Sequence, residues 1–146
     1  MMFRNILVPV DGSPLSMAAM RKAMALARES GAKTVALTVT EPFHTFSASP
    51  DQLEWTREQY DKHVGARAEE ILHEVRQEAS ALGVTCDALH TAQDDPYEAI
   101  VHVARDHGCD LIAMASHGRR GLAAIVLGSV TTKVLTHTQV PVLVYR

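Results

Sequence analysis

The sequence predicts an α/β fold in which a parallel, doubly wound sheet carries helices on both faces. Strand-like and helix-like segments alternate along the 146 residues with short connections between them, which is typical of such sheets. Residues 6–10 and 111–114 are apolar throughout, as strands buried on both faces are. Ligands bind this architecture at the carboxyl ends of its strands, where the strand order reverses. We therefore expect a functional site at that edge of the sheet.

The first strand and the first helix have clear boundaries. Residues 6–10 form the predicted strand. Ser13 is a good N-cap and Pro14 suits the first helical turn, while Gly31 is predicted to end the helix. The core side of this helix is a stripe of methionines at helical spacing, which indicates packing: Met17, Met20 and Met24.

The second strand is predicted over residues 34–40, which are rich in β-branched side chains. Residues 41–48 are expected to form a loop. Ser49 and Gln52 have the spacing of a capping box, so a long helix is predicted over residues 50–82. At roughly 1.5 Å per residue it would be about 50 Å long, so we expect its first half to project, bend or fray. Two aromatic residues on that half are expected to be exposed for a partner or folded over the cleft: Trp55 and Tyr60.

The rest of the chain repeats the alternation. Three further runs are predicted strands: residues 84–91, 111–114 and 141–145. Asp95 and Glu98 form a second capping-box pattern with Pro96 between them, and this pattern opens a helix that ends at Gly108. A last helix includes residues 130–135.

Composition argues against several classes of protein. The net charge of −3 provides no basic field for nucleic acid. No apolar run approaches the roughly 20 residues of a membrane span, and the first residues do not resemble a signal peptide. The two cysteines form no C-x-x-C pair, and the eight histidines have no ligand spacing. We therefore expect a cytoplasmic protein without a membrane or nucleic-acid partner, and predict no metal site from the histidines.

Residues 115–129 are the most informative segment, because they follow a buried strand and lead into a helix. They contain three glycines and two arginines, and the backbone N–H groups of a Gly-rich turn and of a helix N-terminus bind phosphate. Arg119 or Arg120 can add charge. Three hydroxyl side chains can add hydrogen bonds: Ser116, Ser129 and Thr131. The segment matches neither a Walker A loop nor a dinucleotide fingerprint. The alternative is that Gly128 is only a turn residue and the arginines lie on the solvated surface.

Two further side chains near the expected cleft have roles that the residues leave open. Asp11 follows the first strand, where a carboxylate can accept hydrogen bonds from ribose hydroxyls or hold a metal; alternatively it caps the next helix, which Ser13 can do alone. His117 is expected to be structural or to contact a ligand. It is not expected to act as a general base, because no nucleophile with an evident partner is near it in the sequence. We predict no catalytic residue.

Three segments together resemble the universal stress protein family: residues 8–13 (VPVDGS), residues 116–129 (SHG through GS) and residues 140–144 (VPVLV). The resemblance covers the whole chain and implies a single domain over residues 1–146. It also implies five parallel strands in the order 3-2-1-4-5, the adenine nucleotide alpha hydrolase-like fold. ATP-binding members carry Gly, two residues, Gly, nine residues, and Gly followed by Ser or Thr. Gly118, Gly128 and Ser129 match this pattern, while Ala115 replaces its first glycine and adds a methyl group.

The resemblance implies an adenine-nucleotide site that takes ATP, with or without Mg²⁺. Adenosine would meet the end of the first strand and the backbone of Val39, and the phosphates would meet the start of the last helix. The expected binding residues are Pro9, Val10, Asp11, Ser13, Val39, Met114, Ala115, Ser116, His117, Gly118, Arg119, Gly128, Ser129, Val130 and Thr131. The protein would be a stress-response binding and signalling module with at most slow hydrolysis. The alternative, which Ala115 favours, is a homodimeric stress protein that binds no nucleotide and acts through protein partners.

The last predicted strand, residues 141–145, is expected at an edge of the sheet. It is apolar, and Pro141 protects only its start by removing one donor. Because an unprotected apolar edge is a pairing hazard, we expect a two-fold partner whose same strand covers it. Val142 and Val144 would then contact their symmetry mates. The family resemblance implies the same homodimer.

Overall fold

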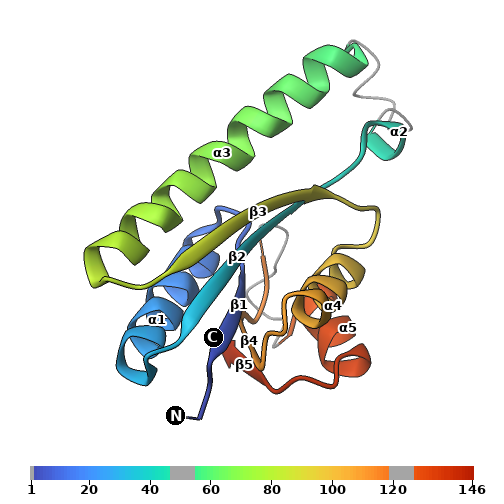
Figure 1. Cartoon of the computed structure of the whole chain (residues 1–146). Coiled ribbons are helices and arrows are strands. Elements are labelled where there is room, and N and C mark those ends of the chain that lie inside the picture. Colours follow the sequence, from blue (N-terminus) through green and yellow to red (C-terminus); the bar gives the residue numbers. More distant parts are fainter. Residues whose placement is uncertain (1, 47–54, 119–126) are drawn as a thin grey trace.

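The chain folds around a five-stranded parallel sheet with the strand order β3-β2-β1-β4-β5 (Figure 1). The computed structural model describes residues 2–46, 55–118 and 127–146. In chain order the elements are β1 (Asn5–Pro9), α1 (Pro14–Ser30), β2 (Lys33–Thr40), α2 (Phe43–Phe46), α3 (Arg57–Leu82), β3 (Cys86–Ala92), α4 (Pro96–Asp106), β4 (Leu111–Ala115), α5 (Ser129–His137) and β5 (Val142–Tyr145). The predicted fold class and strand order are confirmed, and the strand ends lie within two residues of their predicted positions.

Helices cover both faces of the sheet. Helices α1 and α3 lie on one face, and α4 and α5 on the other (Figure 1). Successive β1 side chains Ile6, Leu7 and Val8 are fully buried and alternate between the two cores, as side chains of a central strand do. The core beneath α1 and α3 includes Met20, Met24, Ile71, Leu72 and Val75. The core beneath α4 and α5 includes Val35, Leu37, Ile100, Ala104 and Val134.

The start and end of α1 follow the predicted signals. Ser13 is the N-cap, and its Oγ accepts a hydrogen bond from the Ser16 N–H at 3.2 Å. Pro14 occupies the first turn, and Gly31 ends the helix. The predicted methionine stripe is buried in the core, which confirms its packing role. These local signals place α1 so that its N-terminus begins directly after the end of β1.

Helix α3 begins later than predicted. Thr56 is its N-cap: the Thr56 Oγ1 accepts the N–H of Gln59 at 3.1 Å, and the Gln59 Oε1 accepts the N–H of Thr56 at 3.0 Å. Because Trp55 and Thr56 precede the helix, the continuous helix predicted over residues 50–82 is wrong at its start. The capping box predicted at Ser49 lies outside the described residues. At roughly 1.5 Å per residue, α3 is about 39 Å long, and its first turns extend past the sheet toward α2 (Figure 1). No helix in the described ranges is long and apolar enough to cross a membrane.

Helix α4 begins at the predicted proline but without the predicted capping box. Asp95 is the N-cap, yet its side chain makes no capping hydrogen bond. Glu98 instead accepts a hydrogen bond at 3.0 Å from the Nε2 of Gln93, which precedes the helix. The capping-box prediction is therefore wrong, because a neighbouring amide outcompetes the backbone for the Glu98 carboxylate.

Candidate functional site

A cavity of about 580 Å³ opens at the carboxyl ends of the parallel strands. Its walls come from the ends of β1, β2 and β4, the connection that follows β3, and the first turn of α5. Strand order reverses between β1 and β4, which is where doubly wound sheets bind ligands. The volume falls within the roughly 300–1,000 Å³ typical of small-molecule sites.

The cavity brings together most of the residues predicted from the sequence. Twelve of the fifteen line it: Pro9, Val10, Asp11, Val39, Met114, Ala115, His117, Gly118, Gly128, Ser129, Val130 and Thr131. Ser13 and Ser116 are buried beside it and are absent from its wall. Arg119, the fifteenth, lies outside the described residues. The sequence motifs and the geometry thus converge on one place in the fold.

The first turn of α5 offers unpaired backbone donors to this cavity. In any α-helix the first N–H groups have no acceptor within the helix. Here the N-cap is Gly128, which has no side chain to accept from them. Ser129, Val130 and Thr131 form the first turn and line the cavity. Such a helix end carries partial positive charge and donors suited to an anion.

Two of the three hydroxyl groups expected to bind phosphate are engaged inside the protein. Thr131 is buried, and its Oγ1 donates its proton to the Ala115 carbonyl at 2.9 Å. Ser116 is buried too, and its Oγ lies 3.0 Å from the Nδ1 of His117. Both hydroxyls thus have a partner within the protein, and Thr131 also lines the cavity; their contact with a ligand stays a prediction. Ser129 is the most exposed of the three and lies at the cavity wall.

Asp11 braces the turn between β1 and α1. Its Oδ1 accepts the N–H of Ser13 at 2.9 Å, and its own N–H donates to the Ser16 Oγ at 3.0 Å. Ser13 supplies the helix cap itself, so the alternative role of Asp11 as the N-cap is excluded. The carboxylate of Asp11 lies at the cavity wall, directly against Gly118.

Several cavity residues were missing from the sequence prediction. They cluster at the end of β2 and in the connection after β3: Thr40, Glu41, Gln93, Asp94 and Pro96. Ser16, Leu37 and Ile100 complete the wall. The rule that ligands meet strand ends could have indicated the first group, since each of these residues lies at the end of a predicted strand or within five residues after it. Glu41 and Asp94 add carboxylates to this end of the cavity.

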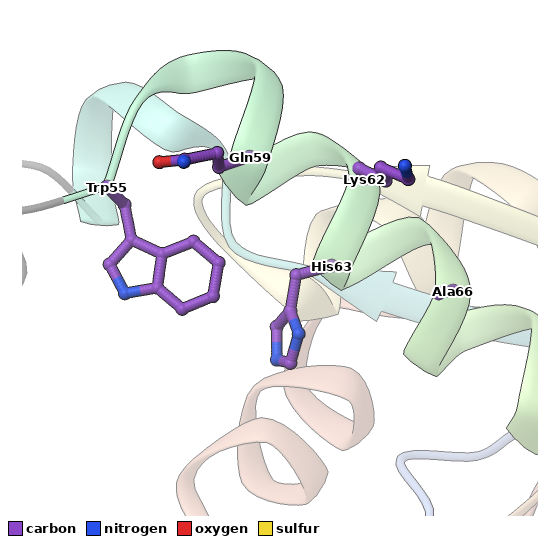
Figure 2. A pocket seen from close by; sticks show the side chains of 5 residues that line it. All are labelled: Trp55, Gln59, Lys62, His63 and Ala66. Carbon is purple, nitrogen blue, oxygen red and sulfur yellow. The ribbon is translucent and has the colours of Figure 1, made fainter.

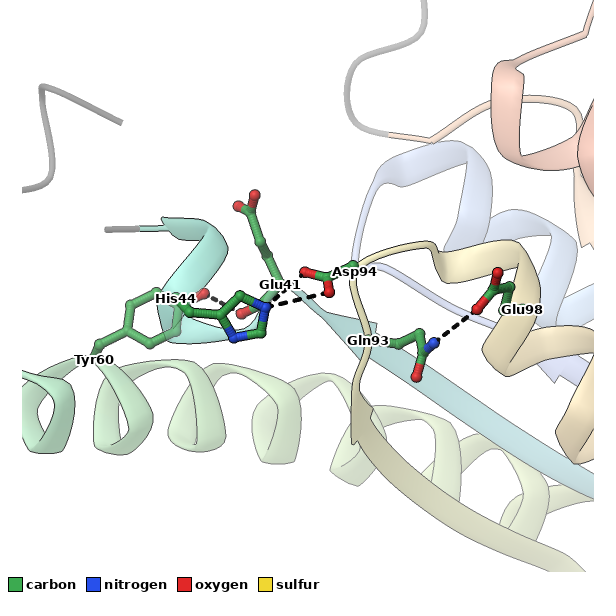
Figure 3. Close-up of polar contacts among 6 residues, drawn as sticks. All are labelled: Glu41, His44, Tyr60, Gln93, Asp94 and Glu98. Atoms are coloured by element: carbon green, nitrogen blue, oxygen red, sulfur yellow. Dashed lines mark hydrogen bonds and ion pairs between the residues drawn. The ribbon is translucent and has the colours of Figure 1, made fainter. Parts of the chain in front are cut away.

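Polar contacts join the structures around this end, as Figure 3 shows. The His44 Nε2 lies 3.2 Å from each oxygen of Asp94 and links α2 to the connection after β3. The Tyr60 hydroxyl, from α3, donates to the Glu41 carbonyl. Burial, with the charges of Glu41 and Asp61, raises the pKa of Tyr60. This hydroxyl therefore keeps its proton across the physiological pH range.

A second hollow, of about 520 Å³, lies beside the start of α3 (Figure 2). It is lined by Trp55, Gln59, Lys62, His63 and Ala66. The Trp55 and His63 rings lie 5.1 Å apart between centroids. Because this lining comes from one helix and the residue just before its cap, the hollow has a single wall. The cavity at the strand ends, with walls from several elements, is the stronger candidate site.

Comparison with known proteins agrees with this architecture. The universal stress protein family matches residues 2–146. Universal stress protein MJ0531 of Methanocaldococcus jannaschii is 31% identical over 147 residues, covering 99% of this chain and 83% of the relative. The solved structure of the hypothetical protein MJ0577 has a TM-score of 0.83 at 28% identity, covering 99% of this chain and 96% of that one. A universal stress protein solved in complex with cAMP has a TM-score of 0.74 at 27% identity, covering 100% and 99%. The chain belongs to the universal stress protein family.

Proposed function

We propose that the protein binds an adenine nucleotide, with ATP as its ligand, in the cavity at the ends of β1 and β4. The observation that carries the proposal is the glycine-capped first turn of α5, which opens into the same cavity as apolar strand ends. One end of that cavity suits phosphate and the other suits a base. A 27% identical universal stress protein was solved with cAMP, which supports an adenine nucleotide as the class of ligand.

The cavity residues fit the parts of such a ligand. Val39 and Met114 give apolar surface for the base. Asp11 supplies a carboxylate that suits ribose hydroxyls, and the amides of the α5 first turn suit phosphate oxygens. Ala115 also lines the cavity, and its methyl group narrows the path that the glycine of the ATP-binding pattern leaves open. Mg²⁺ would neutralise phosphate charge as part of the nucleotide complex. Among the described residues, no group of three or more His, Cys, Asp or Glu could hold a metal on its own.

The proposed activity is binding, with at most slow hydrolysis. Asp11 and His117 are the proton acceptors beside Gly118 and Gly128, and both are engaged in protein contacts. Fast hydrolysis needs a group that orients an attacking water, and we propose no cavity residue for that role; the Asp11 Oδ1 and the His117 Nδ1 take part in contacts with Ser13 and Ser116. The protein would therefore act as a binding and signalling module of the stress response.

Calorimetry with ATP and Mg²⁺ tests this proposal. Saturable binding with a micromolar dissociation constant is the expected result. The same titration without Mg²⁺ separates the contribution of the metal from that of the α5 amides. The absence of both heat and a thermal shift at millimolar ATP would contradict the proposal.

The second candidate function is a homodimeric stress protein that acts through protein partners without a nucleotide. Ala115 in the cavity wall and the exposed Leu143 on β5 favour it. Native mass spectrometry of the purified protein distinguishes the two functions, because tightly bound nucleotide often copurifies. A mass that corresponds to protein plus nucleotide supports nucleotide binding. A dimer mass without nucleotide, unchanged when ATP is added, supports the second function.

A further inference from the structure

The end of β2 forms one wall of the cavity and is fixed by contacts from three elements. Thr40 and Glu41 both line the cavity. The Gln93 N–H donates to the Thr40 carbonyl at 3.0 Å, and the Thr40 Oγ1 lies 2.7 Å from the Nε2 of His90 on β3. The third contact comes from α3, whose Tyr60 hydroxyl donates to the Glu41 carbonyl (Figure 3). Tyr60 itself is not part of the cavity wall.

Tyr60 differs from its neighbours on α3 in being buried. Its side chain is 5% exposed, and the next buried residue of the helix is Ala68. Its ring packs against Phe43 of α2 with 5.6 Å between centroids. This end of α3 extends past the sheet, so the sheet does not account for the burial of Tyr60. Its contacts are with Phe43 of α2 and the carbonyl of Glu41.

The contact between His44 and Asp94 lies in the same region, and it is weaker because both side chains are exposed to solvent. His44 and Asp94 side chains are 73% and 56% exposed, and exposed ion pairs contribute little to holding a structure. The Tyr60 side chain is buried and its hydrogen bond to the exposed residue Glu41 is partly buried, and leaving a buried donor unpaired is costly. Tyr60 is therefore the side chain that contacts the Glu41 peptide directly, whereas His44 and Asp94 contact each other.

We infer that Tyr60 is a positioning residue for the base end of the proposed nucleotide site. This inference rests on the proposed function. By holding the Glu41 carbonyl, Tyr60 fixes the backbone of residues 39–41 and the direction of the Glu41 side chain, both of which belong to the cavity wall. The phosphate end is built separately from Gly128 and the first turn of α5. Tyr60 should therefore act on the base and its sugar, and not on the phosphates.

The test compares ATP with adenosine, which has no phosphates, in wild type and in the variant Tyr60→Phe. The variant keeps the ring against Phe43 and removes only the hydroxyl. The loss of one hydrogen bond predicts a dissociation constant weakened about 3- to 10-fold. The factor should be the same for ATP and adenosine. Ser129→Ala, at the phosphate end, should weaken ATP binding and leave adenosine binding unchanged.

Tyr97→Phe is the matched control. Tyr97 is half buried on α4, and its hydroxyl lies 3.4 Å from the Glu98 Oε1. The Tyr97 side chain does not line the cavity. Removing this hydroxyl should leave both ligands' affinities unchanged, which separates positioning from a general loss of stability. Circular dichroism at the assay temperature verifies that each variant is folded.

Each result decides the inference. Equal weakening of ATP and adenosine in Tyr60→Phe, with Tyr97→Phe unchanged, supports it. Unchanged affinities in Tyr60→Phe, or weakening of ATP alone, overturn it while the proposed function stands. Wild-type protein that binds neither ligand overturns the proposed function and the inference together. If Tyr60→Phe does not fold, Phe43→Leu, which loosens the same ring contact, should give the same equal weakening, and its absence overturns the inference.

Discussion

Two glycines in the cavity wall lie so close to other groups that a larger residue would force them apart. A Cβ built on Gly118 would overlap the Asp11 Oδ2. A Cβ on Gly128 would lie 3.1 Å from both the Cα and Cβ of His117, and 3.3 Å from the Ser116 carbonyl oxygen. Gly128 is also the N-cap whose missing side chain leaves the α5 amides open. At these positions glycine is required by close approach rather than by an unusual backbone angle.

Replacing Gly128 by Val should abolish ATP binding. The branched side chain would push against the His117 backbone and cover the first turn of α5. Calorimetry measures the loss, and circular dichroism verifies that the variant is folded. A folded Gly128→Val protein that binds ATP normally would show that this loop is not the site.

Gly65→Val is the control for that substitution. Gly65 lies within α3, and a Cβ there would meet nothing within 4 Å. Valine and glycine differ by only a few tenths of a kcal/mol in helix propensity, about 0.5 kcal/mol at most. The control should therefore retain both its stability and its ATP affinity.

Cys109 predicts a pH dependence of stability. Burial, with the charge of Asp110, raises the pKa of this thiol from its ordinary 9.0 to about 11, against a smaller opposing effect of Lys33. The folded protein thus holds the proton more tightly than the unfolded chain. This contribution to stability is complete below pH 9 and is lost as the pH rises from 9 to about 11, by at most about 1.4 kcal/mol per pH unit.

Urea unfolding at a series of pH values across this window measures the effect. The free energy of unfolding should fall more steeply with pH in wild type than in Cys109→Ala. Cys86→Ala, at the half-buried second cysteine, should keep the wild-type slope. Parallel curves for wild type and Cys109→Ala would contradict the assignment.

At the scale of elements, the sequence predicts best what local chemistry controls. The cap at Ser13 and the buried runs of β1 and β4 depend on neighbouring residues, and their positions are confirmed. The predicted start of α3 was wrong because the same capping pattern, Ser or Thr followed three residues later by Gln, occurs at Ser49 and again at Thr56. A local signature cannot choose between two copies of itself. The copy at Thr56 caps α3, whose first turn places Tyr60 against Phe43 of α2.

The candidate site shows the same division. Motifs along the chain located the ends of β1 and β4 and the first turn of α5, and these meet in the cavity. The Thr131 hydroxyl donates to the Ala115 carbonyl, sixteen residues away. No sequence pattern shows which hydroxyl groups will form hydrogen bonds inside the folded protein. Glu41 and Asp94 were missed for a related reason. They lie in connections without a motif, and they come together only because β2 and β3 are neighbours in the sheet.

At the scale of the whole molecule, the two edge strands differ in their cover. Strand β3 lies beside α3, which runs along it (Figure 1). Strand β5 pairs with β4 on one side, and the described ranges contain no strand beyond it. Its Leu143 side chain is 51% exposed, whereas Val142 packs against the core beneath α4 and α5. The exposed surface of this edge therefore centres on Leu143 rather than on the two valines expected from the sequence.

We predict a homodimer in which β5 pairs with the same strand of a two-fold partner. An apolar edge with free backbone donors and acceptors is stabilised by such pairing.

Val142→Lys would also disturb the core that Val142 contacts, so Leu143→Lys is the cleaner test. Near the two-fold axis it brings like charges together, and it should shift the protein toward monomer. Leu135→Lys on α5, where the leucine is 42% exposed, is the matched control and should leave the dimer intact. Light scattering at several concentrations measures the masses. Wild-type protein that stays monomeric at high concentration would refute the interface.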